Sequence, residues 1–456
     1  MLKTVYFMNQ KKRVLAVITL MFVCVSGAFS QENKQTLNLH DCIEYGLANN
    51  PTSTIFKNEV ELAKYTNWSA IGNYLPSING NYSHDFNAKL QTSIVPAGIF
   101  GPDEIRMQIG QKHINSALIQ VEQKIYDQTA LIGFKAMRFN DSLARLKLLK
   151  NNEDLIYNTA NAYYNVLIIV EQEKLLNENE KQYADLLEIM KLQYDKGTIR
   201  KMDYDRTRVA YNNIKSQLNV LKANKEMAVN RLKTAIGMPI EQEIKLNEEL
   251  PLDNSVVTPV ESRFDVTERL DYKIQEQNII LTEIQTKIAR YSGLPTLSAY
   301  ARYGANAYGT EFGPSFKNWF DYSAVGFKVN VPIFNGLKVH TSYKTNQVQL
   351  MNLKESARLN IENYKLESQN ASTQLYSSYN NLTSNKENMV LAKDVYDASN
   401  VSYKAGQSSL TDLLNSDYSY KEAQSNYIYS LLNYITSRLT LEKSKGTLTN
   451  YISTLK

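Results

Sequence analysis

The sequence contains almost no cysteine. Only two of its 456 residues are cysteines, and the first, Cys24, lies in an N-terminal segment that we expect to be removed. The remaining Cys42 cannot form a disulfide within the chain. A chain of this length must therefore be held together by packing or by assembly with other chains.

Long apolar runs are also missing outside the N-terminal segment. The longest, Val166–Val170, has five residues, whereas a helix needs about 20 apolar residues to span a membrane. The sequence therefore predicts no transmembrane helix. If the mature chain enters a membrane, it must do so as a closed β-barrel, the other structure that satisfies every backbone group in lipid.

The chain has little net charge once its first 30 residues are set aside. The formal charge is +5, but residues 1–30 hold four basic side chains and no acidic one. This leaves 47 basic and 46 acidic residues. Such a nearly neutral chain gives no electrostatic argument for binding nucleic acid.

Catalytic and metal-binding motifs are absent from the sequence. Its four histidines are isolated and lack the spacing of metal ligands; they are His40, His84, His113 and His340. Phosphate-binding loops and the common hydrolase motifs are missing too. We therefore expect no enzymatic activity, no cofactor and no metal, so the energy for any transport must come from a partner.

The N-terminus is typical of a secretory signal peptide, which we assign to residues 1–30. Lys11-Lys12-Arg13 supplies the positive start, Val14–Val25 the short apolar core, and Ala28-Phe29-Ser30 the cleavage site. The residues before Cys24 lack the small pair of a lipoprotein cleavage site, so we expect no lipidation there.

Three short landmarks occur twice in the mature chain, in the same order and about 208 to 219 residues apart, which indicates an internal duplication. The pairs are Leu75–Ile78 with Leu294–Leu297, Ile125–Leu131 with Ile333–Val339, and Tyr194–Gly197 with Tyr403–Gly406. In each copy an alternating segment runs directly into a long helical one. The repeated unit is therefore a strand pair followed by a long helix.

Each copy contains two long segments with the period of a β-strand. Apolar and polar residues alternate over 78–90 and 113–126 in the first copy, and residues 91–112, rich in proline and glycine, are expected to form a loop. The resulting hairpins span 78–126 and 295–334. Aromatic residues crowd the loop end of the second hairpin, as in a girdle at a lipid interface, although the edge of a soluble β-sandwich has similar residues. They are Tyr300, Tyr303, Tyr308, Trp319, Phe320 and Tyr322.

The segments after the hairpins have helical periodicity over exceptional lengths. Residues 129–236 and 337–445 are each predicted to form a long helical hairpin, whose first helix alone reaches roughly 100 Å. No globular core needs helices of this length, so they must bury their apolar seams against one another. The expected domains are the signal peptide 1–30, a first repeat 37–239, an equatorial linker 240–262, a second repeat 263–446 and a C-terminal tail 447–456.

One chain supplies four amphipathic strands, and four strands cannot close around a lumen. Either the strands form a soluble sheet or several chains share one barrel. Three chains would give 12 strands above 12 helical rods, which favours a cyclic homotrimer.

The segment Leu39–Pro51, Leu-His-Asp-Cys-Ile-Glu-Tyr-Gly-Leu-Ala-Asn-Asn-Pro, resembles the N-terminal signature of the TolC-like outer-membrane efflux family. The duplicated landmarks are similar to that family as well, and the resemblance covers residues 37–446. It implies a mainly α-helical, internally duplicated fold: a long α-helical coiled-coil barrel plus four transmembrane β-strands per chain, completed as a 12-stranded β-barrel in a trimer. The linker and the C-terminal tail would join an equatorial collar.

The resemblance also implies which residues contact partners. The two helical turns that resemble adaptor-docking turns are Lys196, Gly197 and Thr198, and Ala405, Gly406 and Gln407. The positions matching the periplasmic gate are Asp203, Asp205, Arg206, Asp412 and Asn415. Because Asn415 stands where the family often has a second acid, a double acidic ring is in doubt. Asp203 and Asp412 are equally well explained as helix N-caps after a glycine turn.

The function implied is that of a passive exit duct in the outer membrane of a Gram-negative bacterium, with its helical part in the periplasm. It would serve a tripartite, multidrug-type efflux pump or a type I secretion system. A periplasmic adaptor and an inner-membrane pump of the RND or ABC type would open its tip, and outer-membrane lipid would surround its barrel. The alternative from the residues alone is an exported structural or adhesive coiled-coil protein of the cell envelope.

Overall fold

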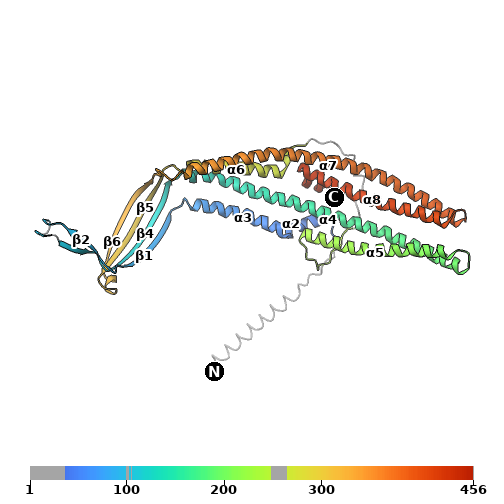
Figure 1. Cartoon of the computed structure of the whole chain (residues 1–456), viewed down its shortest axis with the longest axis horizontal. Helices are drawn as coiled ribbons and strands as arrows, with labels where there is room; N and C mark the ends of the chain where they lie inside the picture. The colour runs from blue at the N-terminus through green and yellow to red at the C-terminus, as the bar shows by residue number, and fades with distance from the viewer. Residues whose placement is uncertain (1–35, 99–101, 104, 248–263, 455–456) are drawn as a thin grey trace, which may run out of the picture.

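The computed structural model is a long helical rod with a β-sheet at one end (Figure 1). It describes residues 36–98, 102–103, 105–247 and 264–454. The signal peptide assigned to residues 1–30 and most of the linker lie outside the described residues. The expected mainly helical, duplicated fold is confirmed, while the division into five domains stays a prediction.

The same series of elements occurs twice along the chain. The first series is α2 (Leu39–Asn49), α3 (Pro51–Gly72), β1 (Ser77–Phe86), β2 (Gln91–Val95), β3 (Ile105–Ile109), β4 (His113–Tyr126), α4 (Gln128–Asp195) and α5 (Lys201–Ile236). The second is η1 (Val266–Glu268), α6 (Leu270–Tyr291), β5 (Thr296–Gly309), η2 (Pro314–Phe316), β6 (Trp319–Asn330), α7 (Lys338–Lys404), α8 (Leu410–Lys445) and α9 (Leu448–Thr454).

Local sequence explains where these elements begin. The first strand of each copy starts directly after a proline, Pro76 or Pro295, which cannot continue the preceding helix. Asp127 caps α4 by accepting hydrogen bonds from the backbone of the first turn. The second copy differs here, because Gly336 and Leu337 both have positive φ (64° and 63°) before α7 begins without a side-chain cap.

The main sheet has four antiparallel strands in the order β1-β4-β5-β6, so the two hairpins meet at β4 and β5. Within one chain β1 and β6 are its outer strands. The expectation of a loop over 91–112 is wrong, because β2 and β3 pair in a separate two-stranded sheet that projects beyond the main one (Figure 1). Each of its strands has only five residues, and apolar residues alternate in β3 but not in β2, so the pair does not stand out among the prolines and glycines.

The helices pack as long antiparallel pairs. With 68 residues, α4 has a length of about 100 Å, and α7 with 67 residues matches it. Near the sheet α3 packs on α4 and α6 on α7; towards the other end α5 packs on α4 and α8 on α7. None of the helices in the described part of the chain combines the length and apolar character that crossing a membrane requires.

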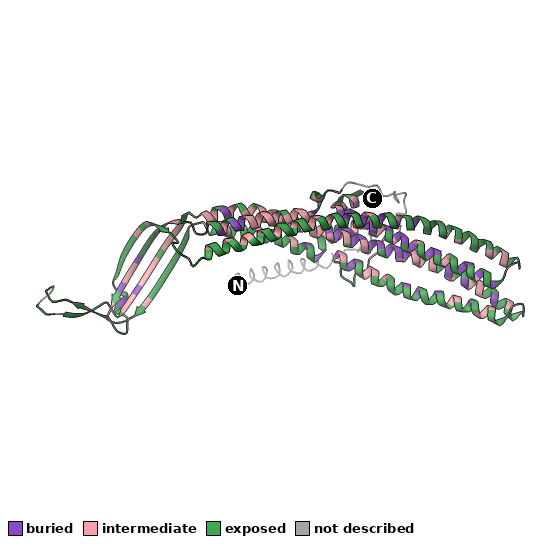
Figure 2. Ribbon diagram, turned by 45° about the horizontal axis from the view of Figure 1, so that its top comes forward, coloured by how far each residue is buried: buried purple, intermediate pink, exposed green. Residues whose placement is uncertain are grey.

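The main core lies half-way along the rod, where α2, α4, α5 and α9 meet (Figure 2). Residues such as Leu167, Leu232 and Leu448 are fully buried there. Gly237 ends α5 with a φ of 72°, and a Cβ at this position would lie 2.7 Å from the backbone of Asn50. The α5 end and the α2–α3 junction can approach this closely only because the residue is glycine.

Candidate functional site

The four-stranded sheet has one strongly apolar face, although that face is exposed. Strand register places Ile78, Val121, Ala301 and Val325 on the same side. Val325 is 84% exposed and Ile78 is 72% exposed. An apolar surface this exposed in a single chain marks a contact with lipid or with another protein.

The opposite face of the sheet is polar. The residues there include Asn79, Gln120, Glu122, Arg302 and Lys328. The sheet therefore has one apolar and one polar face along all four strands.

The aromatic residues expected to form one girdle are divided between these two faces. Tyr303 and Trp319 share the apolar face, where Tyr82 and Phe86 join them from β1. On the polar face are Tyr300, Tyr308, Phe320 and Tyr322. Those four cannot contact lipid if the apolar face does, so the expectation for them is wrong. Alternating strand geometry, not crowding in the sequence, decides which face an aromatic residue occupies.

At the far end of the rod, the α4–α5 and α7–α8 hairpins each reverse through a glycine turn. We call residues 190–206 and 403–415 the helical tip. Gly197 and Gly406 have φ values of 72° and 74°. In each turn the glycine N–H and the following N–H bond back to the helix, and all four N···O distances are 2.9 Å. The two turns therefore have the same geometry.

The two acidic residues at the tip are not N-caps, which corrects the simpler of the two sequence interpretations. Arg200 caps α5 without a side-chain hydrogen bond, and Asp203 lies in its first turn. Ser409 caps α8, and Asp412 is its capping-box partner, with 2.7 Å between Ser409 Oγ and Asp412 Oδ2. Hydrogen bonds from Ser409 lower the pKa of Asp412.

The two hairpins pack against each other at the tip. Met190 of α4 is fully buried against Leu410 and Leu413 of α8. On the surface, Arg206 donates to the Thr411 hydroxyl at 3.3 Å. Among the expected gate residues of the described chain, Arg206 thus makes a side-chain hydrogen bond from one hairpin to the other.

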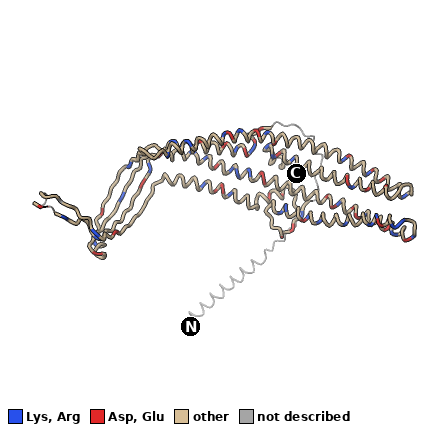
Figure 3. Tube along the Cα trace, in the orientation of Figure 1, with Lys and Arg blue, Asp and Glu red and all other residues tan. Residues whose placement is uncertain are grey.

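Charge is distributed unequally between the two turns (Figure 3). Residues 196–206 of the first carry four basic side chains and two acidic ones, whereas the equivalent residues 405–415 of the second carry a single charge, that of Asp412. A channel opening lined by both turns would therefore have basic and uncharged regions as well as the carboxylates of its acidic residues.

A buried ion pair lies two helical turns above the second glycine turn, and sequence reasoning missed it. Asp417 accepts a hydrogen bond from the Tyr183 hydroxyl of α4 and pairs with Lys421 at 2.7 Å. The Lys421 ammonium lies 3.7 Å from the centre of the Tyr183 ring. Burial lowers the pKa of Lys421 despite the attraction of Asp417, and burial with that carboxylate raises the pKa of Tyr183. The sequence signal that could have suggested this pair is the charged residue Asp417, which occupies a position of α8 that faces the core.

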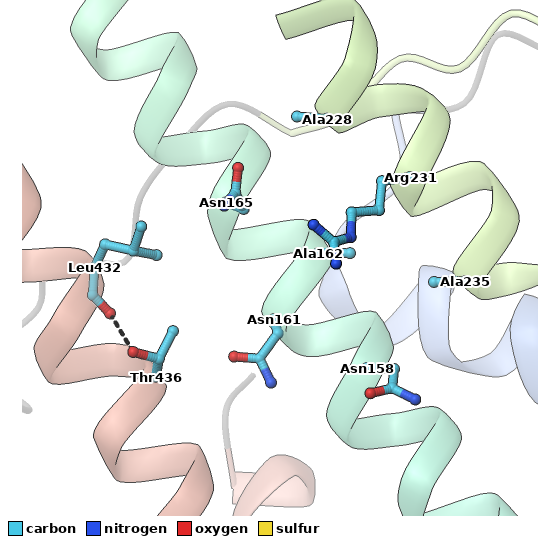
Figure 4. Close-up of a pocket in the computed structure, with 9 residues that line it drawn as sticks. All are labelled: Asn158, Asn161, Ala162, Asn165, Ala228, Arg231, Ala235, Leu432 and Thr436. Carbon is cyan, nitrogen blue, oxygen red and sulfur yellow. Dashed lines mark hydrogen bonds between the residues drawn. The ribbon is translucent and has the colours of Figure 1, made fainter. Parts of the chain in front are cut away.

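A polar groove of about 370 Å³ lies where α4 passes between α5 and α8 (Figure 4). It is lined by Asn158, Asn161 and Asn165 of α4, with Arg231 of α5 and Thr436 of α8. The lining contains no acid–base pair and no nucleophile beside a base.

The structure brings two of the four histidines together, although 29 residues separate them. His113 Nδ1 lies 3.4 Å from His84 Nε2 near the loop end of the sheet. Across the described ranges, no cluster of three or more potential metal ligands of the His, Cys, Asp or Glu type occurs. In the sequence the two histidines look isolated, because residue spacing alone does not reveal the strand register that brings them together.

The helical rods, the amphipathic sheet and the paired glycine turns agree with a comparison of the whole chain with known families. The model of the outer membrane efflux protein family matches residues 47–238 and 268–447. The chain belongs to the outer membrane efflux protein family. The two matched stretches correspond to the two series of elements, and the interpretation as an exported structural coiled coil is thereby overturned.

Curated relatives are similar over most of their length. Outer membrane protein TolC of Escherichia coli strain K12 is 21% identical over 349 residues, covering 73% of this chain and 69% of TolC. The alkaline protease secretion protein AprF of Pseudomonas aeruginosa is 20% identical over 343 residues, covering 72% and 69%.

Solved structures share the fold at low identity. The outer membrane protein VceC of Vibrio cholerae has a TM-score of 0.73 at 13% identity and covers 90% of this chain and 96% of VceC. The CmeC outer membrane channel of Campylobacter jejuni has a TM-score of 0.70 at 15% identity, with 94% of each chain covered. As a member of this family, the protein is an outer-membrane efflux channel.

Proposed function

We propose that three copies of this chain form one passive duct through the outer membrane. The observation that carries the proposal is the four-stranded sheet with two outer strands, β1 and β6, and opposite apolar and polar faces. An unpaired strand edge is not tolerated in lipid, and four strands are too few to close on themselves. Pairing β6 of one copy with β1 of the next gives 12 strands with the apolar face outside.

We further propose that the helical tip docks a periplasmic adaptor, which connects the duct to an inner-membrane pump of the RND or ABC type. The two glycine turns support this, since Lys196, Gly197 and Thr198 present backbone in the same conformation as Ala405, Gly406 and Gln407. A trimer would present six such turns at nearly the same height along its axis. The pump supplies the energy, and the duct performs no chemistry.

The gate in this proposal lies beside the docking turns. The residues of the proposed gate all lie within nine positions of Gly197 or Gly406; they are Asp203, Asp205, Arg206, Asp412 and Asn415. Docking that separates the two hairpins would break the Arg206–Thr411 contact and expose the Met190 cluster.

The test is to purify the protein from the outer-membrane fraction and examine it by gel electrophoresis and in planar lipid bilayers. A trimer that dissociates only on heating, with stepwise ion conductance, is the expected result. Recovery as a water-soluble monomer with its hairpins folded would reject the duct.

A further inference from the structure

His84 of β1 and His113 of β4 form a cross-strand pair near the loop end of the sheet. His84 lies opposite Asn115 and His113 opposite Phe86, so the histidines are diagonal neighbours. Their rings stack with centroids 5.4 Å apart. Both side chains are partly exposed. They lie on the apolar face but in its last rows at the loop end, which in the proposed duct is the rim farthest from the helices, where water can reach them (Figure 1).

Hydrogen bonds around Asn115 determine the tautomer of His84. The Asn115 amide nitrogen donates to the carbonyl and the hydroxyl of Ser315, at 2.9 and 3.0 Å. Since a backbone carbonyl can only accept, the amide cannot be reversed. Its oxygen therefore faces the Tyr82 hydroxyl at 2.8 Å and His84 Nδ1 at 2.7 Å. His84 Nδ1 must carry the proton, so the lone pair on His84 Nε2 points out of this network towards His113.

The distance between the two ring nitrogens is informative. At 3.4 Å it exceeds the roughly 2.7–3.2 Å of ordinary protein hydrogen bonds from nitrogen donors. Two imidazole nitrogens bound to one tetrahedral metal, each about 2.0–2.1 Å away, lie about 3.4 Å apart. The proton on His84 Nδ1, donated to an amide oxygen, matches the arrangement that orients metal-binding histidines.

We propose that His84 and His113 form a two-histidine site for a divalent transition metal that prefers imidazole, namely Zn²⁺, Cu²⁺ or Ni²⁺. His84 binds through Nε2, His113 through Nδ1, and water completes the coordination. With two protein ligands the site is open and exchangeable rather than a closed structural centre. It lies at the opposite end of the molecule from the helical tip and does not depend on the docking proposal.

A bound metal would fix the surface on which the β5–β6 loop rests. Phe312 of that loop packs edge-on against the His84 ring with 5.3 Å between centroids, and Phe316 stacks on the same ring at 6.0 Å. Phe312 also contacts the His113 ring at 5.9 Å. The metal therefore ties β1 to β4 and, through these rings, holds the loop against the apolar face.

The experiment uses the purified full-length mature protein in detergent. Titration with Zn²⁺ by calorimetry and with Cu²⁺ by electron paramagnetic resonance should give one metal per chain, with nitrogen hyperfine structure on copper. His84→Gln and His113→Gln should each weaken binding at least tenfold. His40→Gln and His340→Gln, which alter histidines elsewhere, are the matched controls and should bind as the unaltered protein does.

A second measurement needs no variant and so does not depend on folding. The electron paramagnetic resonance spectrum of Cu²⁺ bound to the unaltered protein should show hyperfine structure from two imidazole nitrogens. A spectrum without nitrogen coupling, or equal affinity of His84→Gln, His113→Gln and the controls, overturns the proposal. A channel that conducts normally yet binds no metal would reject this site alone and leave the duct intact.

Discussion

Gly197 and Gly406 are the residues on which the geometry of the helical tip depends. Both have positive φ, and a Cβ at either position would meet no atom within 4 Å. A substitution there is therefore opposed by backbone conformation alone and not by a clash. Substitutions at these two glycines therefore test the backbone conformation of the turns without disturbing the packing of the helices.

We predict that Gly197→Val and Gly406→Val each destabilise their turn by about 1–2 kcal/mol, the cost of placing a side-chain-bearing residue in the left-handed region. Efflux should fall sharply while trimers persist in the membrane, since nothing is displaced. Drug or substrate sensitivity of cells carrying each variant measures this. Gly133→Val, which makes the same change within α4 at a glycine without positive φ and with equally open surroundings, is the control. Equal efflux in all three variants would exclude a docking role for the turns.

The capping box of α8 gives a pH-dependent prediction. The folded-state pKa of Asp412 is lowered by hydrogen bonds from Ser409, so its contribution to stability is present above the ordinary value of 3.8 and is lost as pH falls below it. Ser409→Ala should cost about 1 kcal/mol at neutral pH and reduce this acid sensitivity. Thermal unfolding at pH 7 and pH 3 measures both effects. An unchanged pH dependence in the variant would show that Asp412 is held by other groups.

At the scale of elements, Arg269 joins the start of α6 to two other helices. Its guanidinium donates to Glu367 of α7 at 2.8 Å and to the Ser444 carbonyl near the end of α8 at 3.0 Å. It also lies 4.3 Å from the centre of the Tyr364 ring. Arg269 is only 6% exposed, so these contacts are shielded from water.

We predict that Arg269→Met destabilises the fold by about 1–3 kcal/mol. Glu367 is 53% exposed and regains water, but the carbonyl of the buried Ser444 is left without its donor. Lys354→Met, which removes a surface ion pair with Glu283, should cost less than about 1 kcal/mol. Chemical unfolding of both variants tests the difference. Equal costs would mean that the Arg269 contacts contribute no more than a surface pair.

Element positions could be predicted well wherever the signal was local. Proline before a strand, alternation within it and glycine after a helix each act on neighbouring residues, so both hairpins and both helical pairs were placed correctly. The β2–β3 hairpin was missed because its proline- and glycine-rich flanks resemble a loop. The cap of α8 was assigned to Asp412 rather than Ser409 because either residue type serves as a cap.

At the scale of the whole molecule, the interactions that sequence could not predict are those between residues far apart in the chain. Tyr183 and Asp417 are 234 residues apart, and His84 and Asn115 meet only through strand pairing. Which partner each side chain finds depends on how the two repeats pack and on strand register. Neither follows from a single segment.

The long helices of the two repeats have almost equal lengths. There are 68 residues in α4 and 67 in α7, and 36 in each of α5 and α8. We predict that removing seven residues from both α4 and α5 abolishes efflux, because three of the six turns in a trimer would recede by about 10 Å. Removing seven from each of the four helices should restore a level tip and, with it, more efflux than the one-sided deletion. Cell resistance assays with matched trimer levels measure this, and equal activity of the two deletions would contradict a shared docking plane.

Cys42, the one cysteine in the described chain, is fully buried, and burial raises the pKa of its thiol to about 12. At neutral pH it stays protonated and out of reach of alkylating reagents. Within the described chain, no accessible native thiol therefore competes for a site-directed label. A single cysteine engineered at a turn or on a strand edge would carry a fluorophore or spin label there, without Cys42 having to be replaced first.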